Sequence, residues 1–163
     1  METTVDPADF KAAMSRFASG VTVCTTLDRE GKAWGFTASA FSSLSLNPPL
    51  ILVCLDKGAE CFEAFEQQDT MGVSILSGGQ NELAMRFATR GADKFSGGIE
   101  PGAATAMPVV TGALAQVECR IKERLEGGDH VILVGEVVAA RVTDDPPLLH
   151  YNRAFGDFVP YDS

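Results

Sequence analysis

Hydroxyl-bearing side chains gather in the segment 35–50, between two apolar runs that are typical of strands. One Thr and four Ser fall within nine residues: Thr37, Ser39, Ser42, Ser43 and Ser45. Small hydroxyl groups and closely spaced backbone N–H groups can hold an anion or a flat heteroaromatic ring without blocking its approach. Such clusters also mark surface loops, so composition alone leaves two interpretations, a ligand pocket or a Ser-rich loop.

Several cationic side chains could meet a phosphate-bearing ligand. The net charge of −9 argues against a general nucleic-acid or anionic-membrane binder, because such binding depends on basic patches. A dinucleotide is also anionic, so a local cationic pocket must hold it within a repulsive overall field. The candidate cations are Lys57, Arg86, Arg90, Lys94 and Arg153.

The four cysteines do not form a metal or redox pattern. They include no C-x-x-C pair, and no His lies at metal-ligand spacing, so we expect no metal site. Cys24, Cys54 and Cys119 lie in apolar runs, where a thiol behaves as a small buried hydrophobe. Cys61 instead opens a short predicted helix.

The spacing of apolar residues predicts a mainly β chain with short helices. The predicted strands are 21–27, 50–55, 71–76, 117–122 and 131–138, and a further strand returns from the turn at 28–31. The run 50–55 is continuously apolar and is expected to be buried on both faces. In 117–122, Glu118, Arg120 and Lys122 are expected on the solvent-facing side. Helices are predicted from Pro7 toward Gly20, at 59–67 and at 80–90, with a long irregular connection at 91–111 and a tail at 148–158.

Six or so antiparallel strands favour one closed or nearly closed β-barrel, which removes exposed sheet edges. A doubly wound parallel sheet is the second option, but no G-x-G-x-x-G follows the first strand. We expect a single domain over 1–163 with its core at about 10–158. The start of the chain is acidic, and no apolar run reaches the roughly 20 residues that span a membrane. We therefore expect a cytoplasmic protein that binds neither membrane nor nucleic acid.

Three motifs give this chain its family resemblance. They are Ser-Leu-Ser-x-x-Pro-Pro-Leu at 43–50, Arg-Phe-Ala at 86–88 followed by Asp-Lys-Phe at 93–95, and Gly-Asp-His at 128–130. With them the chain resembles, over about 10–158, the short-chain flavin reductases, split-barrel NAD(P)H:flavin oxidoreductases that supply reduced flavin to a separate monooxygenase. The resemblance implies an antiparallel FMN-binding split β-barrel that forms a homodimer, with the flavin near the subunit interface.

The resemblance also implies the cofactor-binding residues. In the Ser-rich segment they are Thr37, Ala38, Ser39, Ala40, Ser42 and Ser43, and around the next strand end Cys54, Lys57 and Cys61. Related proteins often carry Ser where this chain has Cys61, which weakens any side-chain hydrogen bond there. Lys94 would provide a point charge for a phosphate and Phe95 an aromatic surface. Alternatively, Lys57 is a solvated turn residue, and Arg86 and Arg90 form an exposed helical pair.

His130 is the implied catalytic residue, because the Gly-Asp-His turn of these reductases lies near the flavin and the nicotinamide. A lone His in a strand is also often structural, but an imidazole here could donate a hydrogen bond to either ring system. Near the C-terminus, Tyr151 is implied to cover the nicotinamide and Arg153 to pair with a pyrophosphate. A tail that only packs on the barrel is the alternative.

The resulting functional hypothesis is an NAD(P)H-dependent flavin reductase that uses FMN or FAD and supplies reduced flavin to an oxygenase. NADH is favoured over NADPH, because the chain is acidic and offers no evident Arg cluster for a ribose phosphate. Two other hypotheses stay open: a non-catalytic flavin- or haem-binding split barrel, and an oxidase of the pyridoxamine-phosphate type. The sequence does not choose between FMN and FAD.

Overall fold

The computed structural model describes residues 4–162, so residues 1–3 and 163 of the expected single domain lie outside the described part. Its main feature is a seven-stranded sheet in the order β3-β2-β6-β9-β10-β5-β4. Every neighbouring pair is antiparallel, which excludes the doubly wound parallel alternative. The strands are β2 (Thr22–Leu27), β3 (Ala33–Ala38), β4 (Phe41–Ser45), β5 (Leu50–Asp56), β6 (Thr70–Ile75), β9 (Ala115–Gly127) and β10 (His130–Val142).

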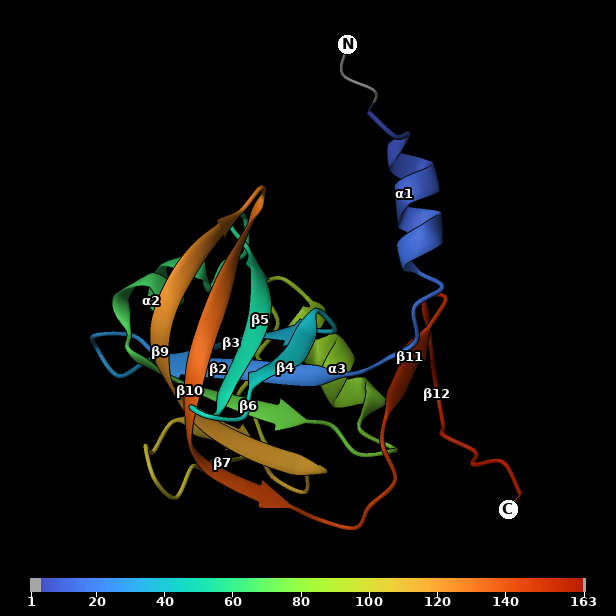
Figure 1. Cartoon of the computed structure of the whole chain (residues 1–163). Helices are drawn as coiled ribbons and strands as arrows, with labels where there is room; N and C mark the ends of the chain where they lie inside the picture. Colours follow the sequence, from blue (N-terminus) through green and yellow to red (C-terminus); the bar gives the residue numbers. More distant parts are fainter. Residues whose placement is uncertain (1–3, 163) are drawn as a thin grey trace.

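The sheet curls into a barrel, as Figure 1 shows by the crossing of β2, β3 and β6 behind β9, β10 and β5. The two strands at the ends of the sheet order, β3 and β4, are consecutive in the chain and are joined through Ser39 and Ala40. At this corner the Cys54 N–H donates to the Ala40 carbonyl at 3.0 Å. The prediction of a mainly β chain with short helices is therefore confirmed.

Three helices and two small sheets complete the described chain. The helices are α1 (Pro7–Met14), α2 (Phe62–Gln67) and α3 (Asn81–Ala88), and α1 extends away from the barrel in Figure 1. One small sheet contains β1 (Ser19–Gly20), β11 (Leu149–Tyr151) and β12 (Ala154–Gly156), and the other contains β7 (Ile99–Pro101) and β8 (Pro108–Val110). Within residues 4–162 no helix is long and apolar enough to cross a membrane.

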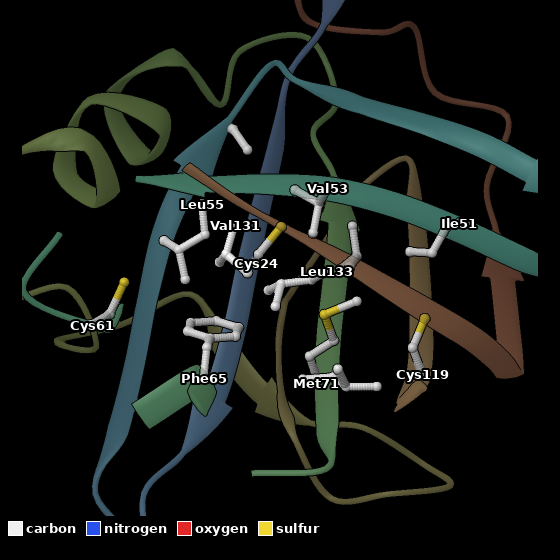
Figure 2. Close-up of a cluster of buried hydrophobic side chains, with 13 residues drawn as sticks. Cys24, Ile51, Val53, Leu55, Cys61, Phe65, Met71, Cys119, Val131 and Leu133 are labelled. Atoms are coloured by element: carbon white, nitrogen blue, oxygen red, sulfur yellow. The ribbon is translucent and has the colours of Figure 1, made fainter. Parts of the chain in front are cut away.

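The barrel interior is filled by apolar side chains from six of the strands and from α2. Figure 2 shows Val53, Leu55, Met71 and Leu133 converging there, with Phe65 of α2 at one end. The Phe65 ring meets the Phe36 ring edge-on at a centroid distance of 5.3 Å. A second cluster lies under α3 and includes Leu83, Phe87, Val110 and Leu148. The strands that line the site are thus packed on a continuous core.

Several details of the sequence prediction differ from the structure. β5 alternates, with Ile51, Val53 and Leu55 buried and the residues between them only half-buried, because one face of this strand is not covered. Glu118 is 5 % exposed rather than solvent-facing, because Thr105 and the backbone N–H groups of Ala104 and Thr105 surround its carboxylate.

Two further differences concern predicted loops, and a third concerns the first helix. The connection 91–111 contains the β7–β8 hairpin instead of being wholly irregular. The Ser-rich segment is not a loop: it forms the end of β3 and all of β4. Serine is not among the residue types that favour strands, so the local sequence does not predict one here. The segment is a strand because it pairs with β2 and β5, which supply its backbone hydrogen bonds. The first helix also ends earlier, at Met14.

Candidate functional site

A cavity of about 430 Å³ opens where the barrel corner faces α3. We call it the main cavity, and it has two walls. The strand wall consists of residues 35–40, then Cys54, Leu55 and Asp56 of β5, and His130 of β10. The loop wall consists of residues 58–61, residues 87–90 and Lys94. The strand wall offers mostly small, uncharged side chains, and the loop wall holds both basic side chains that line the cavity.

Backbone packing determines the position of the strand wall. At Gly35 a Cβ atom would lie 2.8 Å from Cε1 of Phe87 and 2.9 Å from the Cys24 carbonyl oxygen, so no other residue fits there without a shift. Thr37 Oγ1 donates to the Ala84 carbonyl of α3 at 2.6 Å. This hydroxyl therefore ties β3 to α3, and the backbone of residues 37–40 is what the wall offers to a ligand.

Two turns meet at one end of the strand wall. Asp56 Oδ1 accepts the Gly58 N–H at 2.7 Å, which closes the turn after β5. The Lys57 N–H donates to the Asp129 carbonyl at 3.0 Å, and His130 pairs with Asp56 in the β5–β10 ladder. The Gly-Asp-His turn is therefore held against the end of β5 by backbone contacts.

The His130 ring lies at the rim of the cavity, with 41 % of its side chain exposed. Its Nδ1 is 2.7 Å from Asp129 Oδ1. The hydrogen bond from His130 lowers the pKa of the Asp129 carboxyl below its usual value, so Asp129 is an ionised acceptor at neutral pH. With Nδ1 held in this way, Nε2 is the ring atom that remains for a ligand.

The loop wall is held together by a buried cation. Lys94 is 8 % exposed, forms an ion pair with Glu60, and donates to the Thr89 carbonyl at 2.8 Å. The Gly91 N–H also donates to Glu60, at 3.1 Å to Oε2. The Lys94 contact, followed by the Gly91 contact, lowers the pKa of Glu60 below its usual range. We call this ion pair the Glu60–Lys94 strut.

Arg86 and Arg90 do not form the predicted helical pair, because α3 ends at Ala88 and Arg90 lies in the turn that follows it. Arg86 donates to the carbonyls of Gly97 at 3.0 Å and Lys94 at 3.4 Å, so it fixes the loop that follows α3. Arg90 lines the cavity, and its guanidinium donates to the Gly58 carbonyl. Within the described residues Arg90 forms no ion pair, although its charge helps to lower the pKa of the nearby Glu60 carboxyl.

Two cysteines line the main cavity. Cys61 is buried against the barrel core, and burial raises the pKa of its thiol to about 11. It stands at the N-cap of α2 and its side chain makes no capping hydrogen bond. Cys54 is half-buried, and burial likewise raises its pKa. All four cysteines lie in the described range and are free thiols, and no metal-binding group of three His, Cys, Asp or Glu occurs there.

Eight residues implied by the resemblance line the main cavity, although they come from six separate elements or loops. They are Thr37, Ala38, Ser39, Ala40, Cys54, Cys61, Lys94 and His130. Their contacts with a cofactor stay predictions. The lining of this cavity is the structural feature that joins the Ser-rich segment to the two other motifs.

Six implied residues lie outside this lining: Ser42, Ser43, Lys57, Phe95, Tyr151 and Arg153. The two serines are exposed on β4, and Lys57 forms an ion pair with Glu126. Phe95 packs edge-on against Phe87 at 5.2 Å. Tyr151 lies in β11, and Arg153 lies in the turn between β11 and β12 with a φ of 64°. The roles assigned to these six also stay predictions.

Sequence reasoning missed Glu60, Thr89 and the Gly58 backbone. Glu60 is 34 residues from Lys94, and no local pattern links the two. Arg90 was among the candidate cations, but its sequence position does not distinguish it from Arg86.

Comparisons with known proteins agree with this geometry. A family model described as "Flavin reductase like domain" matches residues 14–158. The chain is 43 % identical, over 92 % of its length and 85 % of the relative, to a protein of Streptomyces coelicolor named actinorhodin polyketide dimerase. It is 40 % identical, over 96 % of its length and 84 % of the relative, to the reductase component of a 4-nitrophenol monooxygenase from Rhodococcus opacus.

A solved structure also matches. It is an NADH:FAD oxidoreductase of Streptomyces globisporus C-1027, determined in complex with NAD and FAD fragments. The TM-score is 0.90 at 34 % identity, and the match covers 99 % of this chain and 100 % of that one. The agreement in fold confirms the predicted split-barrel class.

Proposed function

Since the chain belongs to the family of flavin reductase-like domains, we propose that its main cavity holds the ring of FMN or FAD and that the protein is an NADH-dependent flavin reductase. The main supporting observation is that eight residues implied by the family motifs line the same cavity. The relatives' names support this activity over a purely binding protein or an amine oxidase.

The cavity fits a flavin in size and chemistry. Its volume of about 430 Å³ falls in the range of roughly 300–1,000 Å³ that small-molecule sites occupy. Ala38 and Ala40 leave the backbone of the strand wall accessible, and the loop wall supplies positive charge for a phosphate. Peptide N–H and C=O groups beside a flat ring are the donors and acceptors that a flavin edge needs.

When bound, the flavin supplies the ring that accepts a hydride from reduced nicotinamide. The strand wall orients that ring, because its atoms are fixed by the sheet and by the packed core beneath it. His130, oriented by Asp129, presents Nε2 at the rim, where it can donate a hydrogen bond to either ring system. Alignment is the main contribution of these residues, and no proton donor is required of the protein.

We assign the phosphate contact to Arg90 rather than Lys94. Two donor positions of the Lys94 ammonium are taken by Glu60 and Thr89, and the side chain is almost fully buried. The charge of Lys94 is also neutralised by Glu60. Arg90 lines the cavity, is not held in an ion pair among the described residues, and can bind a phosphate with two N–H groups at once.

The activity is tested by oxidation of NADH, and then NADPH, with and without added FMN or FAD. We expect rapid turnover that depends on added flavin and is faster with NADH. Flavin binding without turnover would instead identify a binding protein, and turnover only with an amine substrate would identify an oxidase. If the protein neither bound flavin nor oxidised NADH or NADPH, the flavin reductase assignment would be refuted.

The reduced flavin is the product that a separate monooxygenase component consumes. A relative that is 40 % identical is itself the reductase component of such a system, which supports this partner class. The supply role is tested by mixing the protein with an oxygenase kept behind a dialysis membrane. Hydroxylated product should still form, because the flavin rather than the protein carries the electrons.

We also propose that the chain forms a homodimer. None of the eight described residues of α1 is buried, yet the helix carries the exposed apolar side chains Phe10 and Met14. A helix of this length is not stable alone in water. Leu46 at 92 % and Val159 at 82 % exposure add further apolar surface. A second copy that covers α1 would account for these exposures.

A second copy packed on α1 would also lie close to the β11–β12 hairpin. The hairpin is tied to the end of α1, because the Asn152 N–H donates to the Ser15 carbonyl at 2.8 Å. The predicted roles of Tyr151 and Arg153 therefore depend on the second copy. Light scattering should give twice the mass of the chain, and Phe10→Asp should shift it toward the monomer. A monomeric mass for the unaltered protein would contradict the proposal. The cytoplasmic location stays a prediction.

A further inference from the structure

A second cavity, of about 290 Å³, adjoins the main cavity, and we call it the side cavity. Both cavities are lined by Gly35, Glu60 and Lys94, so they meet at the Glu60–Lys94 strut. The remaining lining of the side cavity is Lys32, Ala33, Trp34, Gly91, Ala92, Asp93 and Phe95. A ligand that fills the main cavity can therefore continue past the strut into a second space.

An aromatic ring in a fixed orientation forms one side of that space. Trp34 is half-buried, and its indole Nε1–H donates to Asp28 Oδ2 at 2.9 Å. The other oxygen, Oδ1, accepts the N–H groups of Glu30 and Lys32, each at 2.9 Å. The β2–β3 turn is thus built around one carboxylate that also orients the indole. A ring held in this way loses little rotational freedom when another ring stacks on it.

Charged groups flank the path between the cavities. Lys32 Nζ lies 4.2 Å from the centroid of the Trp34 ring, and Lys32 itself is exposed. Like Arg90, Lys32 forms no ion pair among residues 4–162. The strut between these two cations is neutral overall. Each cation has a carboxylate nearby, Asp28 for Lys32 and Glu60 for Arg90, but neither is held in an ion pair. A diphosphate at the junction would therefore have two cations within reach.

We propose that the side cavity is a subsite for the adenosine half of FAD, so that this chain prefers FAD to FMN. The proposal rests on the proposed flavin site in the main cavity. The exposed Lys32 side chain can leave the Trp34 ring for the diphosphate, so that a purine stacks on the indole in its place. The Asp93 and Glu60 carboxylates can accept hydrogen bonds from an adenine amine or from ribose hydroxyls. The diphosphate crosses at the strut, where Arg90 and Lys32 can reach it. The group that the side cavity would recognise is adenosine diphosphate. We attribute it to FAD because the side cavity shares Gly35, Glu60 and Lys94 with the proposed flavin site.

The test uses the fact that Trp34 is the only tryptophan of the chain. Trp34 also lines a cavity beside Glu30 and Glu63, whose carboxylates repel a diphosphate. Quenching of its fluorescence by ADP, which has no flavin ring, therefore reports on the side cavity, and we expect it in the unaltered protein. We expect FAD to bind about tenfold more tightly than FMN, since one base stacked on an aromatic ring typically gives an effect of this size. Flavin binding is measured separately, by quenching of flavin fluorescence.

Two variants sharpen the assignment. Trp34→Leu should weaken FAD binding about tenfold and leave the dissociation constant and the turnover of FMN unchanged. Trp34→Phe keeps a stacking surface and should retain most of the preference for FAD. Melting temperatures of both variants control for folding. If Trp34→Leu does not fold, the ADP titration and Trp34→Phe still decide the question.

Three results would overturn the proposal. The first is equal binding of FAD and FMN with no quenching by ADP; if FMN were still reduced, only the subsite would be lost and the reductase assignment would stand. The second is an equal loss of FMN and FAD binding in a folded Trp34→Leu, which would make Trp34 a structural part of the main cavity. The third is a Trp34→Leu variant with a raised KM for NADH and unchanged FAD binding, which would place the adenosine of NADH, rather than that of FAD, in the side cavity.

Discussion

The strand wall and the loop wall of the main cavity are built by different physical means. The strand wall is held by ladder hydrogen bonds and by the core beneath it, and its side chains hardly contribute charge. The loop wall is held by contacts between side chains and distant backbone, such as those of Lys94, Glu60 and Arg90. Backbone hydrogen bonds hold the strand wall rigidly, which suits the precise placement of a flat ring. Side-chain contacts hold the loop wall, so substitutions there can change the charge of the site without altering the barrel.

Filling the strand wall should have the largest effect. Ala40→Phe places a ring where the flavin ring is expected, and the backbone contact of Ala40 with Cys54 does not require the methyl group. We expect flavin binding to weaken about 100-fold, which corresponds to about 3 kcal/mol. The matched control is Ala140→Phe, an exposed position of β10 away from the cavity. Equal affinities for the two variants, measured by fluorescence titration, would show that the ring lies elsewhere.

Breaking the strut should have the next largest effect. Removing one partner of a fully buried ion pair costs roughly 3–5 kcal/mol. The Glu60 side chain is 29 % exposed, so we expect Glu60→Gln to lower the free energy of unfolding by about 2 kcal/mol. The double variant Glu60→Gln with Lys94→Met should recover most of this loss, because no buried charge remains. Urea denaturation measures both, and a double variant less stable than Glu60→Gln would contradict the strut.

The same pair predicts a pH dependence. Lys94 lowers the pKa of Glu60 in the folded protein, so the pair stabilises the fold above the unfolded pKa of a glutamate, about 4.3. This stabilisation is lost as the pH falls through the lowered pKa. The difference in stability between the unaltered protein and Glu60→Gln should therefore be constant from about pH 6 to 8 and shrink below about pH 4. A difference that grows in acid would refute the ion pair.

Changes at the rim should affect the reaction more than the fold. His130→Ala removes one hydrogen bond to a ring, and we expect about tenfold slower flavin reduction with a raised KM for NADH. Asp129→Asn keeps the imidazole and loses only its ionised partner, so its effect should be smaller. Stopped-flow reduction under anaerobic conditions measures both rates. Unchanged kinetics in His130→Ala would remove its catalytic role.

The smallest effect concerns the thiols. Burial raises the pKa values of Cys24 and Cys119 to about 12 and that of Cys61 to about 11, so these three should react slowly with a disulfide reagent at pH 8. Cys54 is half-buried in the strand wall and should react first. Bound flavin should slow that reaction about threefold, as mass spectrometry of the labelled peptide can show. Faster labelling of Cys61 than of Cys54 would contradict the burial of the loop-wall thiol.

The sequence could predict most of the strand wall and little of the loop wall. Thr37 to Ala40 and Cys54 lie next to each other because apolar alternation identifies strands, and a barrel brings neighbouring strands together. Glu60 and Lys94 meet only after α2, β6 and α3 have folded between them, so nothing in their local sequence indicates the contact. Lys94 shows this gap: the sequence identifies it as a positive charge for a phosphate, but does not indicate its ion pair with Glu60.

The decisive measurement is a crystal structure of the protein with FAD bound. We expect the isoalloxazine ring against residues 37–40 and Cys54, the diphosphate at Arg90 and the adenine at Trp34. Flavin density at another surface, with the main cavity unchanged and filled by solvent, would contradict it.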